Sequence, residues 1–385
     1  MPDVARLPLR EVDLQQDLSL PGWIYRDPEF FEVEMRRVIR PSWQIVCHVS
    51  DIPKVGDWRS LDILGESVIV IRGADEAVRA FANVCRHRGS RLVDGTGGCA
   101  KRLTCPYHGW TYGAEGRLIG VPRKGDYEGL DPADWGLIPV EFEQWHGFLF
   151  VRLESGGRSV ADMMAPYEEE VAPYRLEEVR ALGRITLRPR DVNWKNVADN
   201  YSDGLHIAVA HPGLTRLFGG NYGIEAGEHA DRMWGDLSER PSRNLSERAY
   251  QHLLPAEAGR RWLYFKLWPN VAFDLYPDQV DFMHFVPVSA TDTVIREISY
   301  ALPDDRREMK AARYLNWRIN RRVNDEDTAL IRRVQQGMAS QLYRPGPLGR
   351  SEVCLRSFAG KLRRLIPEAR RDRPPPPGWS APSRA

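Results

Sequence analysis

Two short pairings of cysteine with histidine constrain this chain of 385 residues more than any other feature. The first is Cys85-Arg-His87, and the second is Cys105-Pro-Tyr-His108. Two thiolates and two neutral imidazoles form the ligand set of an asymmetric [2Fe–2S] cluster, in which one iron takes both sulfurs and the other takes both nitrogens. A glycine follows each pair within two residues, and glycine allows a tight turn beside the ligands. The sequence therefore predicts that these side chains bind a [2Fe–2S] cluster.

Zinc is the alternative metal for the same side chains. Structural zinc sites usually pair two cysteines in C-x₂₋₄-C and two histidines in H-x₃₋₅-H, whereas each half of this motif mixes one cysteine with one histidine. A zinc-binding structural protein is therefore the less favoured interpretation, and a colourless purified protein would support it. The remaining cysteines, Cys47, Cys99 and Cys354, lie outside the motif, and an odd total of 5 does not suit a disulfide framework.

The composition is that of an ordinary globular protein. Hydrophobic residues make up 42% of the chain and charged residues 28%, which excludes collagen, coiled coil and extensive disorder. The formal net charge of +1 gives no large field of one sign, so nucleic acid is not an expected partner. The longest apolar runs, at residues 67–71 and 147–153, are too short to cross a bilayer, and residues 1–10 lack the apolar core of a signal peptide. We therefore expect a cytoplasmic protein without a membrane partner.

Hydrophobic patterning separates a helical start from a β-rich module. Residues 28–39 carry apolar side chains at helical spacing, and Asp27 followed by Pro28 is a typical helix start. From about residue 42 to 153, short runs rich in Val, Ile and Phe alternate with Gly and Pro, which is typical of a small all-β module. A Gly/Ser patch at residues 154–158 closes this module.

The rest of the chain shows a mixture of helical and strand patterns. Helices are predicted at residues 191–210 and 306–340, and strands at residues 261–276 and 280–288. Residues 373–380 are rich in proline, so the tail is expected to be extended or disordered.

A second candidate metal site lies within this mixed region. His206 and His211 are five residues apart, slightly more than one helical turn, so both rings can reach one metal if the helix loosens before Pro212. Two histidines and one carboxylate form the facial triad of O₂-activating Fe(II). The acidic candidates lie together on the long predicted helix: Asp325, Glu326 and Asp327. Taken alone, a histidine pair of this spacing and an acidic triplet on a helix are more often structural.

The motifs Cys85-Arg-His-Arg-Gly89 and Cys105-Pro-Tyr-His-Gly-Trp-Thr-Tyr112 resemble the signature of the Rieske ring-hydroxylating and related oxygenases. The resemblance covers nearly the whole chain. It implies an α+β fold, with a small all-β Rieske [2Fe–2S] domain inserted in a helix-grip catalytic domain whose antiparallel sheet is covered by helices. The implied division is residues 1–41 as the N-terminal helical part of the catalytic domain, 42–153 as the Rieske domain, 154–370 as the catalytic mononuclear-iron domain and 371–385 as a Pro-rich tail.

The resemblance also implies which carboxylate completes the iron site. In the family, the third iron ligand is an acidic residue on a helix that leads to a Val-Gln pair. Asp327, ahead of Val334 and Gln335, matches this pattern, and Asp325 is the alternative.

A further acidic residue is implied to carry electrons between subunits. In the family, an acidic side chain at the position of Asp203 hydrogen-bonds an iron-ligating histidine and a cluster-ligating histidine of a neighbouring chain. The resemblance therefore implies that Asp203 links His206 to His108 of the partner subunit in a homotrimer. Asn200, one turn earlier, is expected to border the iron pocket.

The implied function is that of a terminal oxygenase, acting as a monooxygenase or dioxygenase on a small molecule with O₂. Electrons would come from a separate NAD(P)H-dependent reductase, with or without a ferredoxin, because this chain has no Gly-rich dinucleotide fingerprint. They would pass through the cluster to the mononuclear Fe(II), where the substrate is hydroxylated or oxidatively demethylated. The remaining class is a Rieske electron-transfer protein without oxygenase activity, which predicts that His206, His211 and Asp327 do not converge.

Two substrate classes remain open. The chain length and the segment at residues 20–28 are similar to the branch that acts on choline, betaines and carnitine, which favours a betaine or another N-methyl amine. That branch commonly carries Glu at the position of Asp203, and the aspartate is more typical of oxygenases that hydroxylate a small aromatic acid or ring.

The aromatic strand near residue 264 and the arginine-rich helix each allow a functional interpretation and a plainer one. Alternation places Trp262, Tyr264 and Trp268 on one face, where they can wall a cationic or aromatic pocket or simply form the sheet core. The arginines of the long helix can dock a reductase or form a solvated face: Arg306, Arg307, Arg313, Arg318, Arg321 and Arg322.

Overall fold

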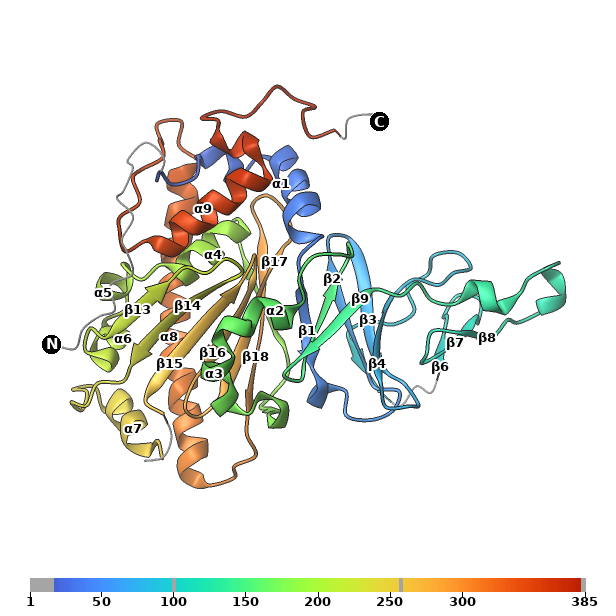
Figure 1. Ribbon diagram of the computed structural model, residues 1–385, viewed down its shortest axis with the longest axis horizontal. Coiled ribbons are helices and arrows are strands. Elements are labelled where there is room, and N and C mark those ends of the chain that lie inside the picture. The colour runs from blue at the N-terminus through green and yellow to red at the C-terminus, as the bar shows by residue number, and fades with distance from the viewer. Residues whose placement is uncertain (1–16, 99–101, 256–258, 382–385) are drawn as a thin grey trace. The chain divides into compact units, whose positions relative to one another are not determined.

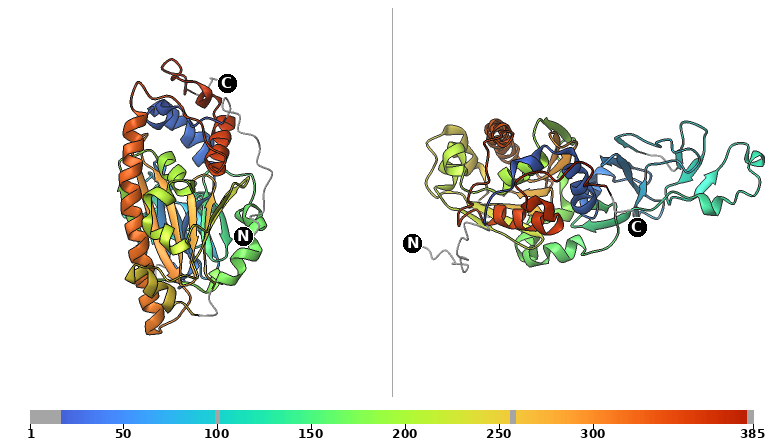
Figure 2. Two further views of the ribbon diagram at one scale, coloured as in Figure 1. Left: turned by 90° about the vertical axis from the view of Figure 1, so that its left-hand side faces the viewer. Right: turned by 90° about the horizontal axis from the view of Figure 1, so that it is seen from above.

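The computed structural model describes residues 17–98, 102–255 and 259–381, so Cys99 lies outside the described residues. The chain forms two compact units (Figures 1 and 2). Unit 1 combines the N-terminal part up to Ile39 with the part from Leu182 onward, and unit 2 consists of Arg40–Ala181. The predicted fold class is confirmed, because a β-rich unit is inserted in the sequence of a unit that mixes helices with a large antiparallel sheet.

The described part of unit 2 contains three sheets of short antiparallel strands, with the orders β1-β10-β9, β4-β3-β2-β5 and β6-β7-β8. Their strands are β1 (Gln44–His48), β2 (Trp58–Ile63), β3 (Glu66–Arg72), β4 (Val78–Ala82), β5 (Thr96–Gly97), β6 (Arg102–Thr104), β7 (Thr111–Gly113), β8 (Leu118–Gly120), β9 (Glu141–Trp145) and β10 (Phe148–Arg152), and the two-residue strand β11 (Arg180–Ala181) lies outside these three sheets. A buried cluster that includes Ile71, Phe81, Trp110 and Leu118 joins the second and third sheets.

Unit 2 continues beyond residue 153, where the sequence placed its end. Its later part contains α2 (Val160–Met164) and α3 (Glu168–Val171). The hydroxyl of Ser159 caps α2, and the carboxylate of Glu143 on β9 accepts from the backbone N–H of Val160 at 2.7 Å. These contacts hold α2 against the sheet, and for this reason the compact unit extends to Ala181. Its short single turns are η3 (Val49–Asp51), η4 (Lys124–Asp126), η5 (Pro132–Trp135), η6 (Ala165–Tyr167), η7 (Ala172–Tyr174) and η8 (Leu176–Glu178).

Unit 1 is built on one antiparallel sheet, in which β18-β17-β16-β15-β14-β13 are successive neighbours and β12 pairs with β18. Its strands are β12 (Thr186–Arg190), β13 (Tyr222–Glu225), β14 (Ala230–Asp236), β15 (Arg261–Leu267), β16 (Val271–Leu275), β17 (Val280–Pro287) and β18 (Thr293–Ala301). The predicted strand at residues 261–276 is in fact two strands, because a turn at residues 268–270 reverses the chain. One row of the register pairs Tyr264 with Asp274, Asp274 with Asp281, and Asp281 with Ser299.

The helices of unit 1 are α1 (Pro28–Glu34), α4 (Trp194–Ser202), α5 (Ile207–Ala210), α6 (Pro212–Phe218), α7 (Leu245–Leu253), α8 (Arg307–Met338) and α9 (Val353–Leu365), with the short turns η1 (Gly22–Tyr25), η2 (Met35–Ile39) and η9 (Pro367–Arg370). Figure 2 shows α8 running along one face of the sheet. Leu214, Tyr250, Trp262 and Met309 belong to a buried cluster that packs α6, α7 and α8 onto this face. No helix among the described residues is both long and apolar enough to span a membrane.

The described part of the Pro-rich tail packs against the N-terminal elements, so of the two expected states, extended or disordered, disorder does not apply there. The ring of Trp379 packs against Trp23 and Phe30, with centroid distances of 6.4 and 6.2 Å. The carboxylate of Glu29 on α1 accepts from the backbone N–H of Gly378 at 2.8 Å. One aromatic anchor and one capped turn are therefore enough to fix this segment.

Candidate metal centres

The two Cys–His motifs form matching turns in unit 2. The N–H of Gly89 donates to the carbonyl of Cys85, and the N–H of Gly109 donates to the carbonyl of Cys105, both at 3.0 Å. Both glycines adopt a positive φ, 71° at Gly89 and 73° at Gly109, which strongly favours glycine. The sequence therefore fixes two equivalent loops, each of which presents one thiol and one imidazole.

The cluster-motif imidazoles lie side by side at the ends of these loops. The ring centroids of His87 and His108 are 4.6 Å apart, and the Nδ1 atoms of both rings are buried without a hydrogen-bond partner in the described part of the chain. Trp110 stacks on His87 at 5.0 Å with an interplanar angle of 9°. Two buried nitrogens without partners are costly unless something binds them.

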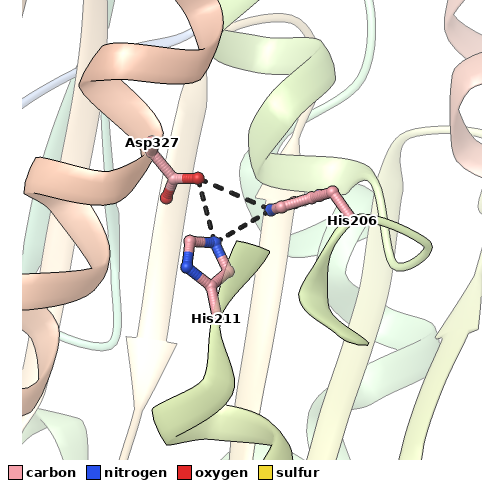
Figure 3. Close-up of side chains that lie close together, drawn as sticks. All are labelled: His206, His211 and Asp327. Carbon is pink, nitrogen blue, oxygen red and sulfur yellow. Dashed lines mark hydrogen bonds and ion pairs between the residues drawn. The ribbon is translucent and has the colours of Figure 1, made fainter. Parts of the chain in front are cut away.

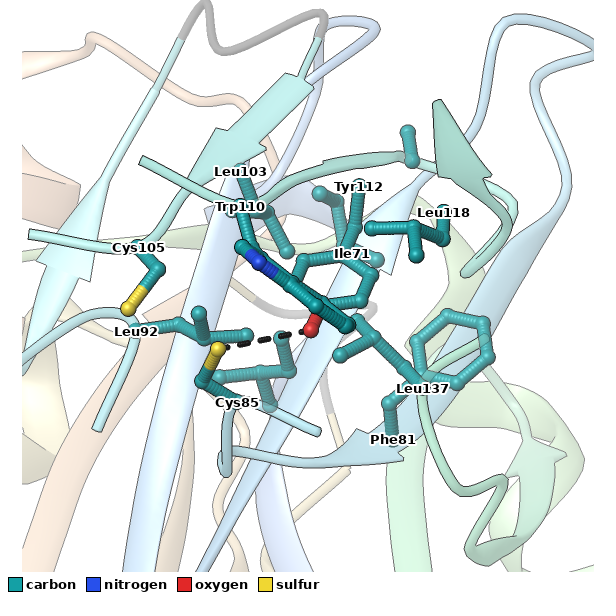
Figure 4. Close-up of a cluster of buried hydrophobic side chains, with 12 residues drawn as sticks. Ile71, Phe81, Cys85, Leu92, Leu103, Cys105, Trp110, Tyr112, Leu118 and Leu137 are labelled. Carbon is teal, nitrogen blue, oxygen red and sulfur yellow. Dashed lines mark hydrogen bonds between the residues drawn. The ribbon is translucent and has the colours of Figure 1, made fainter. Parts of the chain in front are cut away.

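The cluster-motif thiols lie at the edge of the buried core of this unit (Figure 4). The Sγ of Cys85 is 3.4 Å from the hydroxyl of Tyr112. Burial raises the pKa of the Cys85 thiol, whereas backbone N–H groups of Tyr107 and His108 outweigh burial at Cys105 and lower its pKa. Two sulfurs and two unpartnered nitrogens around one space fit the ligand set of a [2Fe–2S] cluster.

The second group of ligands lies where the predicted helix at residues 191–210 breaks. Asn193 caps α4 by accepting from the N–H of Lys195 at 3.0 Å, and α4 ends at Ser202. Asp203 has extended backbone, with φ −89° and ψ 124°, so it does not share a helical face with His206 as the sequence suggested. His206 and His211 flank the single turn α5, and this places both rings on one side.

The ligand atoms of His206, His211 and Asp327 meet at one point (Figure 3). The Nε2 atoms of the two histidines are 3.1 Å apart. Oδ1 of Asp327 lies 3.0 Å from Nε2 of His211 and 3.5 Å from Nε2 of His206. Ligands about 2.1 Å from one ion at right angles to each other are about 3 Å apart, so the spacing fits a facial triad. The convergence contradicts the expectation for a simple electron carrier.

The remaining ring nitrogen of each triad histidine faces a carboxylate. Nδ1 of His206 lies 3.2 Å from Oδ2 of Asp203, and Nδ1 of His211 lies 2.8 Å from Oε2 of Glu326. Such carboxylates orient a ligating imidazole and make it a better donor to the metal. From the sequence, Asp203 was expected to hydrogen-bond His206, but Glu326 was not expected to orient a histidine. The only sequence feature that pointed to Glu326 was its position beside Asp327.

Two polar residues near the triad have distinct surroundings. Asn200 donates from Nδ2 to Oδ1 of Asp327 at 3.1 Å. Asp325, the alternative ligand, is exposed on α8 and is not part of the converging group.

The electrostatics of the triad favour positive charge at its centre. Burial opposes ionisation of Asp327, but His206 and His211 outweigh it and hold its pKa at about 2. Burial also lowers the pKa of His206, and Asp203 and Asp327 together overcome this and raise it to about 9. His211 is shifted upward by Asp327 and Glu326, again against burial. A divalent cation is well suited to this surrounding.

The family models of known proteins match both units. Residues 42–131 match the Rieske [2Fe-2S] domain, and residues 167–368 match the ring hydroxylating alpha subunit (catalytic domain). The chain belongs to the family of ring hydroxylating alpha subunits. It is therefore an oxygenase with a Rieske [2Fe–2S] cluster and a mononuclear iron, which confirms the predicted class of enzyme and its cofactors.

Curated relatives of this Rieske oxygenase include amine monooxygenases. The carnitine monooxygenase oxygenase subunit of Escherichia coli K12 is 28% identical over 339 residues, which is 86% of this chain and 87% of the relative. The glycine betaine monooxygenase oxygenase subunit of Pseudomonas aeruginosa UCBPP-PA14 is 36% identical over 200 residues, 51% of this chain and 46% of the relative.

Solved structures agree on the fold. A quaternary ammonium Rieske monooxygenase in complex with an inhibitor superposes with a TM-score of 0.79 at 24% identity, covering 94% of this chain and 99% of the other. Naphthalene 1,2-dioxygenase from a Rhodococcus species superposes with a TM-score of 0.73 at 21% identity, covering 90% and 94%.

A cavity of ≈ 160 Å³ opens onto the triad of this oxygenase, and residues of the sheet and of α8 line it. Its size is close to that of a cavity that holds benzene, so it suits a small substrate. Its aromatic lining comes from several separate elements: Tyr201, Tyr222, Tyr264, Tyr276, Phe285 and Trp317.

Only one of the three aromatic residues predicted from β15 reaches this cavity. Tyr264 lines it, whereas Trp262 is fully buried and donates from Nε1 to the hydroxyl of Tyr250 at 3.0 Å. Trp268 lies beyond the end of β15 and packs on Phe358 at 5.1 Å. Strand alternation places Trp262 and Tyr264 on the same face of the sheet, but it could not show that Trp262 is buried in the core and Tyr264 lines the cavity.

The arginines of α8 also have different surroundings. Arg321 lines the cavity, and Arg313 donates to the backbone carbonyls of Leu302, Asp304 and Asp278 at 2.9–3.1 Å. Arg313 is therefore a structural residue and does not contribute to a docking surface.

Proposed function

We propose that this Rieske oxygenase oxidises a C–H bond beside the nitrogen of a small N-methyl amine, with electrons from a separate reductase. The single observation that carries the proposal is a metal triad facing a small cavity whose wall combines aromatic rings with carboxylates. Aromatic faces and carboxylates together attract an ammonium group. An aromatic carboxylic acid, the alternative substrate, would instead be repelled by Asp274 and Asp281 in the wall.

The residues of unit 1 divide the work between holding the metal and orienting its ligands. We assign His206, His211 and Asp327 as iron ligands, because their donor atoms converge at about the spacing of a facial triad. Asp203 and Glu326 fix the two imidazoles through Nδ1. When bound, the cluster supplies single electrons and the mononuclear iron activates O₂ for attack on the substrate.

The loops of unit 2 give different surroundings to the two histidines assigned to the cluster. His87 is enclosed by the rings of Trp110 and Tyr127, at 5.0 and 5.8 Å. Apart from His87, the ring that His108 packs against is Tyr107, at 3.7 Å, and Tyr107 is itself 59% exposed. We propose that His108 is the electron exit and that Asp203 of the partner subunit accepts its N–H in a homotrimer.

The chemistry predicts a measurable product. Oxidation of an N-methyl group takes one O₂, two electrons and two protons, and yields water and an N-hydroxymethyl group. That group loses formaldehyde and leaves the demethylated amine. The experiment supplies the iron-loaded enzyme with dithionite or a surrogate reductase and measures O₂ uptake and formaldehyde across betaines, choline, N-methyl amino acids and benzoates.

Matched variants make the result specific. His206→Ala removes an assigned ligand, and His252→Ala removes an exposed histidine on α7. We expect formaldehyde from an N-methyl amine with the wild type and His252→Ala, and none with His206→Ala. Uptake with benzoates alone, without formaldehyde, would replace the proposal with aromatic hydroxylation.

A further inference from the structure

The cavity at the triad has an acidic floor formed by neighbouring strands. Asp274 on β16 and Asp281 on β17 are directly paired in the register and therefore lie on the same face of the sheet. Both line the cavity. Glu297 on β18, the next strand, lines it as well. Like charges directly opposite each other destabilise a sheet, so this arrangement needs a compensating interaction.

The acidic pair receives hydrogen bonds but no ion pair. The oxygens of Asp274 accept from the hydroxyls of Tyr201 at 2.5 Å and Tyr276 at 2.9 Å. Oδ1 of Asp281 accepts from Nε2 of Gln279 at 2.9 Å. No lysine or arginine in the described part of the chain forms an ion pair with Asp274 or Asp281. Among the described residues, neither aspartate therefore has a positively charged partner of its own.

The basic residues that line the cavity are engaged elsewhere. Arg188 forms a close ion pair with Glu297. Arg190, on the edge strand β12, donates to Asn324 at 3.4 Å. Arg321 is exposed, and its guanidinium lies over the ring of Trp317 at 5.3 Å. Arg188 is thus neutralised, and among the described residues neither Arg190 nor Arg321 forms an ion pair with Asp274 or Asp281.

The acidic floor and the triad both line the cavity, and helix α4 contacts both of them. Tyr201, which donates to Asp274, directly follows Asn200, which donates to Asp327. Burial raises the pKa of Asp274 to about 6, and burial together with Asp274 raises that of Asp281. The two raised pKa values mean that ionising both carboxyl groups together is unfavourable. A cation bound between the two carboxylates would offset this penalty.

We propose that Asp274 and Asp281 determine specificity, by binding the ammonium group of a substrate that has a net positive charge and no carboxylate. The inference rests on the proposed function and narrows it. A betaine and its alcohol share the same ammonium head, but the carboxylate of glycine betaine is only two bonds from that head and would be held close to the acidic side chains that bind it. The cavity thus selects cationic N-methyl amines over zwitterions.

The test compares two ligands that differ only in this feature. Choline and glycine betaine are titrated calorimetrically into the iron-loaded holoenzyme without reductant. We expect choline to bind about tenfold or more tightly than glycine betaine. Asp281→Asn should lower the affinity for choline about tenfold and leave the affinity for glycine betaine unchanged or higher. Asp281→Glu retains the charge and should retain the preference.

Controls separate the two ways in which the proposals can fail. Asp305→Asn, at a fully exposed aspartate before α8, should change neither affinity. The absorbance of the cluster and the thermal unfolding of each variant verify that it is folded. Preferred binding of glycine betaine, or equal loss of both ligands in Asp281→Asn, would overturn the inference while leaving amine oxidation intact. Turnover of benzoates alone would overturn the proposed function.

Discussion

Each triad histidine presents Nε2 to the same point because a carboxylate holds its opposite nitrogen. The contact between His211 and Glu326 is the shorter of the two, at 2.8 Å, against 3.2 Å between His206 and Asp203. Glu326 is itself steadied by Arg322, whose Nε donates to it at 3.1 Å. The geometry therefore assigns Glu326 a positioning role for the metal.

Glu326→Gln is expected to lower the affinity for iron about 10- to 100-fold, as loss of such a hydrogen-bonded carboxylate typically does. The measurement is competition for Fe(II) by a chromophoric chelator, with labile sulfide assayed to show that the cluster is intact. Asp325→Asn is the matched control, since Asp325 is exposed and adjacent. A larger loss of iron in Asp325→Asn than in Glu326→Gln would show that Asp325 has the role we give to its neighbours.

The roles of the consecutive acids could not be read from the sequence. Successive helix residues point about 100° apart, so the three neighbours point in different directions and only one is placed to supply the third ligand. The periodicity of α8 does not say which one, because the position of the metal relative to the helix axis is set by α4 and α5. Matching the family pattern selected Asp327, and the structure adds that Glu326 faces His211 and Asp325 faces solvent.

Asp274 gives a pH-dependent stability with a defined sign. Its pKa in the folded protein, about 6, is raised above the ordinary value of 3.8 by burial. A raised carboxyl pKa means that the folded state favours the proton, so the stabilisation is complete below pH 3.8 and is lost as pH rises through 6.

Asp274→Asn should therefore become progressively more stable relative to the wild type between pH 4 and pH 8, by on the order of 1–3 kcal/mol. Urea unfolding at a series of pH values measures the difference in free energy of unfolding between the variant and the wild type. The altered hydrogen bonds to Tyr201 and Tyr276 would shift this difference by a constant amount and would not change its dependence on pH. A difference in stability that does not change with pH would contradict the account.

At the scale of elements, a buried ion pair joins α1 to α4 within unit 1. Nζ of Lys195 lies 2.8 Å from Oε1 of Glu34, and both side chains are fully buried. The ammonium group also donates to the carbonyl of Ile24 at 3.0 Å and lies over the rings of Tyr25 and Phe30. This pair holds the N-terminal part of the chain against the helix that leads to the iron ligands.

Lys195→Met should destabilise unit 1 by about 3–5 kcal/mol, because it leaves the buried Glu34 carboxylate without a positive charge beside it. The double variant Lys195→Met with Glu34→Leu removes both charges and should recover most of the loss. Urea unfolding followed by near-ultraviolet circular dichroism measures both. A double variant as unstable as the single one would mean that packing, and not the unpaired charge, accounts for the loss.

The elements differ in how well the sequence predicted them. The helix start at Asp27 and the long α8 were found because both have strong local signals, a cap and a sustained period. β18 was missed because Arg296 and Glu297 interrupt its apolar alternation, and Glu297 lines the cavity. The end of the helix after α4 was missed because Asp203 and Gly204 are not by themselves a decisive stop signal. In the structure the backbone N–H of Leu205 donates to the side chain of Asp203 and stabilises the turn there.

At the scale of the whole molecule, the fold and the two metal groups follow from a few local motifs. The cluster motif lies within turns that glycine fixes, and the insertion of a β-rich unit is visible as a change of texture in the sequence. The cavity could not be predicted, because its aromatic and acidic residues come from α4, α8 and several strands that meet only in the folded unit.

Electron transfer between subunits is testable by mixing inactive chains. Cys85→Ser should lose the cluster, and His206→Ala should lose the mononuclear iron, so each alone is expected to be inactive. Co-expressed and purified together through two different tags, they should regain activity if electrons cross from His108 of one chain to Asp203 of the partner subunit. Mixed assemblies that contain both metal groups and remain inactive would show that the electrons stay within one chain.

The most direct test of the central claim is a single turnover without any reductase. The iron-loaded enzyme is reduced with dithionite, freed of reductant, and mixed with O₂ and an N-methyl amine. We predict that formaldehyde appears together with the optical change of cluster oxidation, and that Asp327→Asn abolishes the formaldehyde. Cluster oxidation with no product from any N-methyl amine, or product that persists in Asp327→Asn, would contradict the claim that this triad is the site of amine oxidation.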